Sequence, residues 1–410
     1  MENNLPEGWV ETSLDQVCNL ITDGTHRTPK YTESGIRFIS IANVRPFQAI
    51  TWNSYERYIS VEEHLELIKR AKPEIDDILF PRIGTLGYAK RIDIEEEMSI
   101  FVGLGLAKPN KRLVLPKYLE YYMNTPFVYE YSTKNATGSG RLTLALRDSR
   151  MMPVRLPPLA EQHRIVAKLD ALMERVERNK QRLDKIPALL KRFRQSVLAA
   201  AVSGRLTEGW RMRYGILDGW KEERLGDLVN VIGGVAYKST SFLKEGQNQV
   251  FRIGNVKPYE LYFEYSPVFV DDAIAKETER YEARVNDILI SMTGTKYKRD
   301  YGYAGIVRDT GKRIFVNQRV SNIRCKSTID PNYLLYWLQT DMFRNHFFSG
   351  ETGNVNQGNV GMDGIREARI QLPALTEQTE IAKIVGNLFA FADKIEARYV
   401  KAKAMLDRLS

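Results

Sequence analysis

Two segments of the chain match residue patterns that enzymes use to methylate adenine. The segment FVGLG at Phe101–Gly105 fits an F-x-G-x-G pattern, in which a glycine turn after a strand admits S-adenosylmethionine. The segment NTPF at Asn124–Phe127 nearly matches N-P-P-F, in which a rigid Pro-Pro segment presents an Asn to the amino group of adenine. Together they raise the hypothesis of an adenine methyltransferase, although only one of the two prolines is present.

The other reactive side chains do not form a recognisable site. Neither GTLG at Gly84–Gly87 nor the segment from Gly294 precedes the Lys-Ser/Thr of a phosphate-binding loop, so nucleotide hydrolysis is not supported. A lone His is more often a surface residue than a base or a ligand, and two Cys cannot build a disulfide framework. These scattered residues are His26, His64, His163, His346, Cys18 and Cys325. We therefore expect no metal site and a reducing cellular interior.

Composition indicates a folded protein with a polyanionic partner. A chain of 410 residues fits two or three domains, and its 43% hydrophobic content is too high for a disordered chain. The 60 Lys and Arg outnumber the 51 Asp and Glu, which favours a polyanionic partner such as nucleic acid. The amino terminus has no targeting pattern, and no apolar run is long enough to span a membrane. We expect a soluble, cytoplasmic protein without a membrane partner.

The sequence repeats once, at a distance of about 210 residues. The segment LPPLAEQHRIVAKLDAL from Leu156 is matched by LPALTEQTEIAKIVGNL from Leu372. Four further matches occur in the same order: LPEGW and LDGW, RFISIANVRP and VFRIGNVKP, DILF and DILI, and YLEYYMNTPF and YLLYWLQTDMF. This period is far too long for a solenoid unit, so each repeat is a domain with its connection to the next.

The repeat provides an internal test of the methyltransferase motifs. At the corresponding places the second copy has FVNQR at Phe315–Arg319 and QTDM at Gln339–Met342, so neither motif is kept. Structural roles, as a strand and a helix end, therefore explain both motifs better. We assign no catalytic residue, no metal ligand and no cofactor to this chain.

Each repeat begins with short β-rich runs separated by turn residues, which indicates a mixed α/β domain. After each Leu-Pro-x-Leu segment the pattern becomes helical. We predict an α+β protein with two similar mixed α/β domains, separated by two long helices that pack as an antiparallel coiled coil around an internal pseudo-twofold. The predicted parts are a first domain at 1–157, a first helix at 158–205, a second domain at 206–373 and a second helix at 374–410.

Apolar residues at three- and four-residue spacing mark the face on which each helix packs. The packing positions are Leu169, Leu172, Val176, Leu183, Ile186, Leu190 and Phe193 in the first helix, and Ile384, Leu388, Phe391, Ile395 and Met405 in the second. A lone stripe of this kind would pack on its own domain. Two stripes in a duplicated chain favour packing on one another, which would hold the two domains at a fixed separation.

These features together resemble the specificity subunit of type I restriction-modification systems. The resemblance rests on LPPLAEQ at Leu156–Gln162, the helix leading into KRFRQSVLAAAVSGRLTEGWR from Lys191, and LPALTEQ at Leu372–Gln378, and it covers essentially the whole chain. It implies two target recognition domains, each reading one half of a bipartite, asymmetric site in double-stranded DNA. It further implies that the helices set the spacing and dock two methyltransferase subunits, and that translocating nuclease subunits join the complex. S-adenosylmethionine is then expected in the methyltransferase subunits.

Two alternatives and one departure from the family pattern stay open. The alternatives are a solitary adenine methyltransferase, which would bind S-adenosylmethionine by itself, and a duplicated protein-interaction scaffold, which would ignore duplex DNA. The departure is that the second repeat ends at Ser410, without a counterpart to KRFRQSVLAAAVSGRLT. We expect this shorter helix to weaken the helix pairing and to affect the stoichiometry.

Base reading requires polar side chains on loops of a rigid frame, and cations that neutralise phosphates. Three loops in each domain have this composition. The candidates in the first domain are Thr25, His26, Arg27, Lys30, Arg82, Thr85 and Arg141. The candidates in the second domain are Lys238, Thr293, Thr295, Lys296, Tyr297, Lys298, Arg299, Asn354, Asn356 and Gln357.

Overall fold

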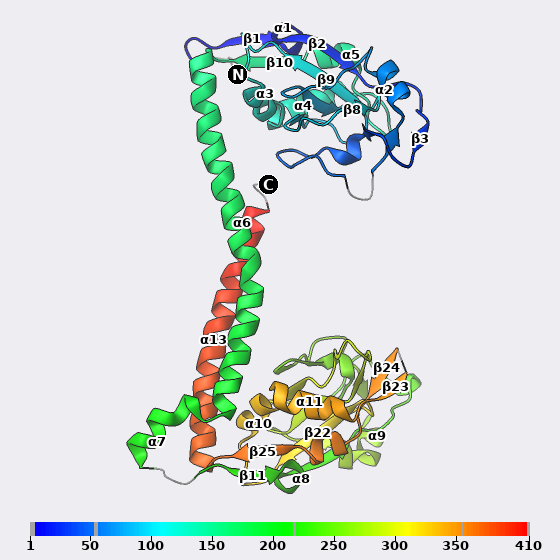
Figure 1. Cartoon of the computed structure of the whole chain (residues 1–410). Coiled ribbons are helices and arrows are strands. Elements are labelled where there is room, and N and C mark those ends of the chain that lie inside the picture. Colours follow the sequence, from blue (N-terminus) through cyan, green and yellow to red (C-terminus); the bar gives the residue numbers. More distant parts are fainter. Residues whose placement is uncertain (1–4, 53–55, 216–218, 355, 408–410) are drawn as a thin grey trace. The chain divides into compact units, whose positions relative to one another are not determined.

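The computed structural model describes residues 5–52, 56–215, 219–354 and 356–407 of the chain. It divides into two compact units, Met1–Arg178 and Asn179–Ser410 (Figure 1). Each unit contains a four-stranded antiparallel main sheet and a second four-stranded sheet with one parallel pair. This confirms the predicted duplication of a mixed α/β domain.

The first unit has a main sheet in the order β2-β9-β6-β7 and a second sheet in the order β3-β5-β4-β8, in which β4 and β8 are parallel. The main-sheet strands are β2 (Cys18–Asp23), β6 (Ile78–Pro81), β7 (Lys90–Arg91) and β9 (Leu104–Pro109). The second-sheet strands are β3 (Tyr31–Thr32), β4 (Ile36–Ile39), β5 (Tyr58–Ile59) and β8 (Met98–Ile100).

The second unit repeats this plan, with a main sheet in the order β12-β22-β18-β20 and a second sheet in the order β16-β13-β21-β17. The main-sheet strands are β12 (Val229–Gly233), β18 (Ile288–Ser291), β20 (Ala304–Ile306) and β22 (Val320–Cys325). The second-sheet strands are β13 (Asn248–Phe251), β16 (Phe269–Val270), β17 (Glu282–Ala283) and β21 (Arg313–Val316). The parallel pair is β13 and β21. A further two-stranded sheet joins β14 (Val256–Lys257) to β15 (Glu260–Leu261).

The repeated Asp-Ile-Leu runs form the centre of each main sheet because their side chains alternate between two cores. Ile78 and Phe80 face one core, whereas Leu79 packs with the second sheet. In the second unit, Ile288 and Ile290 face the core that contains the helices, whereas Leu289 packs with the second sheet. Each main sheet is therefore buried on both faces, with helices on one side and the second sheet on the other.

The helices that cover the main sheets occupy the same places in both units. They are α3 (Pro116–Met123) and α4 (Pro126–Lys134) in the first unit, and α10 (Pro331–Trp337) and α11 (Asp341–Ser349) in the second. The shorter helices are α1 (Leu14–Val17), α2 (Val61–Leu67), α5 (Leu146–Arg150), α7 (Glu208–Tyr214), α8 (Leu225–Leu228), α9 (Asp272–Glu277) and α12 (Asp363–Arg366).

The Leu-Pro-x-Leu-x-Glu-Gln segments join a small sheet to a long helix in both units. The strand β1 (Val10–Ser13) pairs with β10 (Pro153–Leu156), and β11 (Lys221–Arg224) pairs with β25 (Arg369–Leu372). The side chain of Gln162 is fully buried, accepts from Leu115 N at 2.8 Å and donates to two backbone oxygens. Gln378 makes the same three kinds of contact, which include acceptance from Asp330 N at 2.8 Å. The repeated motif therefore anchors each long helix to its domain.

The two long helices are α6 (Leu159–Val202) and α13 (Leu375–Leu406). Within the second unit, α13 lies along the carboxyl-terminal part of α6 (Figure 1). Arg194 Nη2 contacts Asp393 at 2.7 Å and Glu396 at 2.8 Å, and Lys403 Nζ lies 3.4 Å from Asp184. Arg194 of α6 thus pairs with residues 393 and 396 of α13, whereas Asp184, earlier in α6, pairs with residue 403, later in α13. The two helices are therefore antiparallel, as predicted.

The buried face of α13 differs from the predicted stripe. The fully or nearly buried apolar residues of this helix are Ile381, Val385, Phe389 and Ala392, the first three of which join α10 and the end of α6 in one core. Phe391 and Met405 are 58% and 68% exposed, and Leu172 of α6 is 53% exposed. These three predicted packing positions are corrected. For Phe391 and Met405 the reason is that α13 packs on its own domain as well as on α6 and so turns a different face inward. Leu172 lies in the part of α6 that belongs to the first unit, where its side chain is exposed.

Candidate nucleic-acid interface

Backbone hydrogen bonds bring two of the predicted loops together in the first unit. The loop after β6 lies beside the hairpin at 137–143, because Gly84 N donates to Leu142 O at 2.8 Å and Leu144 N donates to Arg82 O at 2.8 Å. The loop after β2 joins them through Asp23, as described below. All three loops are thus held at one edge of the main sheet.

The second unit brings its corresponding loops into a small sheet. The strands β19 (Thr293–Gly294), β24 (Gln357–Asn359) and β23 (Thr352–Asn354) pair in that order. Lys296 Nζ also donates to Gly353 O at 3.0 Å. Two loops that are about 60 residues apart in the sequence therefore form one surface.

The tip of this surface is exposed and its backbone is strained. Tyr297 and Arg299 have positive backbone φ angles of 70° and 50°, which residues other than glycine rarely adopt. Tyr297 is 75% exposed. Strained backbone conformations of this kind are found often at binding sites. They persist only where contacts from the surrounding structure hold them.

Arg344 of α11 provides that support, although no sequence pattern pointed to this residue. Its guanidinium donates to the carbonyl oxygens of Arg299, Tyr301 and Gly302 at 3.0, 3.3 and 3.1 Å. It also lies 5.1 Å from the centre of the Phe348 ring, on which Arg299 packs at 5.0 Å. Because the three carbonyl oxygens belong to residues more than 40 positions away from Arg344, no local pattern could have revealed these hydrogen bonds.

Three of the predicted DNA-contacting residues are buried within the protein. Thr25, Arg82 and Thr293 are only 7–9% exposed. Thr25 Oγ1 closes its own turn on Arg27 N at 3.3 Å, Arg82 is bound by Asp23 and by Leu144 O, and Thr293 lies in β19. We correct the assignment of Thr25 and Arg82 from base contact to support of the loops. Thr293 is buried in β19, and its Oγ1 has no hydrogen-bond partner among the described residues.

Two further side chains of the second unit also shape their own loops. Asn354 Oδ1 accepts from the backbone of Asn356 and of Gln357 at 3.2 and 3.1 Å, and Thr295 N donates to Asp300 at 2.7 Å. The predicted residues with exposed side chains at these loops are His26, Arg27, Lys30, Thr85, Arg141, Lys238, Tyr297, Lys298, Arg299, Asn354, Asn356 and Gln357.

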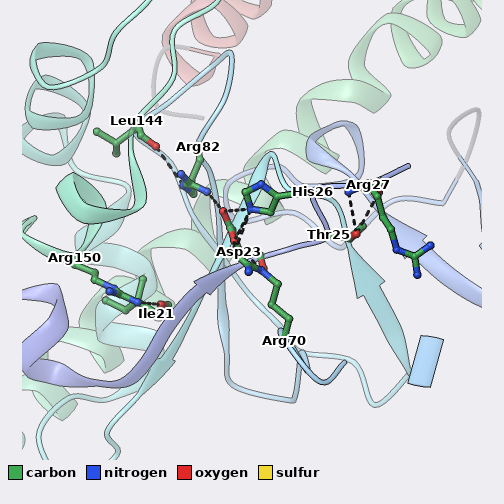
Figure 2. Close-up of polar contacts among 9 residues, drawn as sticks. All are labelled: Ile21, Asp23, Thr25, His26, Arg27, Arg70, Arg82, Leu144 and Arg150. Carbon is green, nitrogen blue, oxygen red and sulfur yellow. Dashed lines mark hydrogen bonds and ion pairs between the residues drawn. The ribbon is translucent and has the colours of Figure 1, made fainter. Parts of the chain in front are cut away.

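A buried carboxylate organises the surface of the first unit (Figure 2). Asp23 ends β2, is 2% exposed and forms ion pairs with Arg82 and Arg70. His26 Nε2 lies 3.2 Å from Asp23 Oδ2. Burial alone would raise the pKa of Asp23, but the hydrogen bond from Arg70 and the charge of Arg82 hold that pKa below its ordinary value. Asp23 is therefore an anion at neutral pH that fixes three basic side chains.

An open hollow of about 570 Å³ adjoins this carboxylate, between the loop after β2 and the helix α2. Its walls carry more basic than acidic side chains, and Arg70 was not among the sequence candidates. The lining residues are Thr25, His26, Arg27, Glu66, Leu67 and Arg70. The concave, mainly basic wall suits a polyanion with acceptor groups.

The second unit lacks the carboxylate and its main partner. Gly233 ends β12 opposite Ser321, as Asp23 ends β2 opposite Gly105. Met292 follows β18 where Arg82 follows β6. The two units therefore share a framework but differ in the chemistry of the surfaces that this framework carries.

The methyltransferase-like motifs have structural roles, as expected. Phe101 and the residues after it form the turn between β8 and β9, and Asn124 caps α3 while its side chain bonds the backbone of Ala89 and Glu120. Among the described residues, no group of three or more His, Cys, Asp or Glu is placed to hold a metal ion. Within the same residues, no helix is both long enough and apolar enough to cross a bilayer.

Comparison with known proteins gives one consistent result. The model of the family described as type I restriction modification DNA specificity domain matches residues 6–188 and 217–403. The chain is 27% identical to the EcoBI specificity subunit of Escherichia coli, over 99% of this chain and 85% of that protein. It is 25% identical to the StySPI specificity subunit of Salmonella potsdam, over 99% and 87%.

The fold comparison agrees. The HsdS subunit from Thermoanaerobacter tengcongensis superposes with a TM-score of 0.65 at 18% identity, over 100% of this chain and 96% of that one. A chain from a study of complex assembly and conformational transition of the type I R-M system gives a TM-score of 0.65 at 19% identity, over 99% and 96%. At this level of identity, these two matches establish the fold.

Proposed function

The chain belongs to the family of type I restriction-modification DNA specificity subunits, and on that premise we propose that each of its two units reads one half of a bipartite, asymmetric DNA site. The family is non-catalytic, so the chain supplies recognition and its partners supply the chemistry. The proposal extends to the parts that follow from it: target recognition domains at 1–157 and 206–373, and spacer helices at 158–205 and 374–410.

The observation that carries the proposal is the difference between two surfaces on one framework. A single duplicated reader would favour two identical half-sites. Here an Asp23–Arg82 pair in the first unit corresponds to Gly233 and Met292 in the second. Asp23 and Arg82 are buried and support the loops. The exposed side chains of the loops differ as well, with Arg27 and Arg141 in the first unit and Tyr297 and Gln357 in the second. Since base edges are distinguished by their donor and acceptor patterns, this difference supports different half-sites.

We further propose that the long helices set the distance between the half-sites and dock two methyltransferase subunits. Large apolar side chains that stay more than half exposed on α6 and α13 support a docking role, because a partner that covers them removes apolar surface from water. They are Leu172, Leu189, Phe391, Val400 and Met405.

In this arrangement S-adenosylmethionine is bound by the methyltransferase subunits and no cofactor by this chain. Translocating nuclease subunits then join to form the restriction complex, which acts on DNA in the cytoplasm. The named relatives are themselves subunits of type I restriction enzymes, which supports an assembly of this kind.

Mapping of methylated adenines tests the proposal. The chain is expressed with the methyltransferase subunit encoded beside it, in a host without other adenine methylation, and the genome is sequenced for modified adenine. We expect one bipartite motif with a fixed gap, in which exchange of one domain changes one half only. A continuous motif, or a motif in which exchange of one domain changes both halves, would overturn the proposal. If no methylation occurs, co-purification with the methyltransferase subunit separates failed assembly from absent recognition.

A further inference from the structure

Arg70 is held in one orientation by a buried anion. Its Nε donates to Asp23 Oδ1 and to Asp23 O, both at 3.2 Å, and its Nη2 forms an ion pair with the same carboxylate. Asp23 is itself fixed by Arg82, which donates to Leu144 O at 3.3 Å. An Arg side chain normally has many rotamers, and these contacts leave Arg70 with few.

Arg70 also lines the hollow beside this carboxylate. The Arg70 side chain is 51% exposed, although its inner edge is fully engaged (Figure 2). Within the described part of the chain, no hydrogen bond or ion pair uses Arg70 Nη1. Nη2 also lies 3.2 Å from His26 Nε2, but this nitrogen lies equally close to the Asp23 carboxylate and donates its proton there, which leaves the outer N–H of Nη2 available. The end formed by Nη1 and Nη2 then has two parallel N–H donors, and Arg70 lines the hollow together with His26.

We propose that Arg70 reads a guanine in the half-site of the first unit, and that Asp23 orients it for this contact. This inference rests on the proposed function. Guanine is the only base that presents two acceptors, O6 and N7, side by side in the major groove, and the planar fork of Arg matches both. Arg70 thus supplies the donor pair that this base requires.

Orientation favours base reading over a phosphate contact. A phosphate accepts donors from many directions, so a flexible cation on the rim serves it equally well, whereas a base edge requires a fixed plane. The exposed Lys69 beside Arg70 is of the flexible kind, since its contact is with the exposed Glu66. A buried carboxylate behind Arg70 provides the fixed plane.

The same comparison limits the assignment to one half-site. The second unit has Gly233 in place of Asp23 and Met292 in place of Arg82, so it has no buried anion at this position to orient an Arg. The guanine contact therefore belongs to the half-site of the first unit alone.

The test uses the assembled complex of full-length chain and methyltransferase subunit, with Arg70→Ala, Arg70→Lys and the matched control Lys69→Ala. Methylated adenines are mapped for each variant. Competition binding is then measured with four duplexes that differ in one base pair of the first half-site. We expect an invariant G·C pair for the unchanged chain and for Lys69→Ala. Both Arg70 variants are expected to lose discrimination at that pair by roughly 5- to 150-fold, with all other positions unchanged.

Each other result counts against the inference. Full discrimination by Arg70→Lys would show that the planar fork of Arg is not what reads this pair. An equal loss of affinity for all four duplexes with a smaller salt dependence would assign Arg70 to a phosphate. An unchanged motif for both Arg70 variants would show that it contacts neither. Arg70→Lys keeps the charge toward Asp23, so it decides the matter if Arg70→Ala does not assemble. Failure of the proposed function itself would be distinct, since the unchanged chain would then direct no bipartite motif.

Discussion

Trp220 donates its indole N–H to Glu377 at 3.2 Å, and this contact joins the start of the second domain to the start of its long helix. Trp9 and Glu161 repeat the contact in the first unit at 3.1 Å. The surroundings differ, because Glu377 is 1% exposed and also accepts from Thr207 at 2.6 Å, whereas the Glu161 side chain is 29% exposed. The same Trp–Glu contact is therefore buried in the second unit and partly exposed to solvent in the first.

We predict that Glu377→Ala destabilises the protein much more than Glu161→Ala. Removal of Glu377 leaves Arg211, which lies 2.5 Å away, without its buried partner and should cost about 3 kcal/mol. Removal of Glu161 breaks contacts that water can replace and should cost about 1 kcal/mol. Thermal unfolding of the two variants measures the difference. Equal losses of stability would mean that burial does not distinguish the two sites.

Ile381→Ala and Phe391→Ala test which face of α13 is packed. Ile381 is fully buried in the core shared by α6, α10 and α13, so its truncation should cost about 2–5 kcal/mol. Phe391 is 58% exposed, and its truncation should change stability by about 0.5 kcal/mol or less. Denaturant titration of the isolated chain gives both values. A large loss of unfolding free energy for Phe391→Ala would show that Phe391 is packed, as the heptad pattern predicts.

Phe391→Ala also has an expected effect on assembly. If exposed apolar residues on α13 contact a methyltransferase subunit, this variant should bind that subunit more weakly while it stays folded. Titration of the subunit onto the chain measures the affinity, with the exposed polar change Lys394→Ala on the same helix as the control.

Asp23→Asn should lower stability at neutral pH and have a smaller effect in acid. Asp23 has a pKa below its ordinary value of 3.8, so the folded state favours the charged form. Its contribution is fully present above the unfolded pKa of about 3.9 and is lost as the pH falls through the lower folded value. The unfolding free energies of Asp23→Asn and of the unchanged chain should therefore differ from pH 7 down to about 4 and converge below it. A difference that is constant down to pH 2 would contradict an ionised Asp23.

Lys296→Ala combined with Arg299→Ala should weaken DNA binding by the assembled complex. Both residues belong to the strained loop of the second unit, and loss of each phosphate contact lowers the salt dependence of log K by about 1. Binding to the cognate duplex at several salt concentrations measures the effect. Unchanged affinity at moderate salt would place DNA elsewhere on this unit.

The mixed α/β domains and the two long helices could be predicted from the sequence because they depend on local signals, and the antiparallel pairing of the helices was inferred from the duplication. Asp-Ile-Leu runs form buried strands in both copies, and a helical period follows each Leu-Pro-x-Leu segment. The second copy also served as a control that excluded the methyltransferase motifs. These conclusions needed no knowledge of which segments meet in space.

The sequence showed which loops have the composition of a DNA-binding site, but it did not show which side chains support the loops and which are free to contact DNA. Arg82 and Thr25 have the chemistry of base readers and are occupied inside the protein, whereas Arg70 and Arg344 gave no signal. The packing face of α13 was decided in the same way, by the domain against which it lies. Arg82, Arg70 and Arg344 bind partners 40 or more residues away in the sequence, so only the tertiary structure could assign their roles.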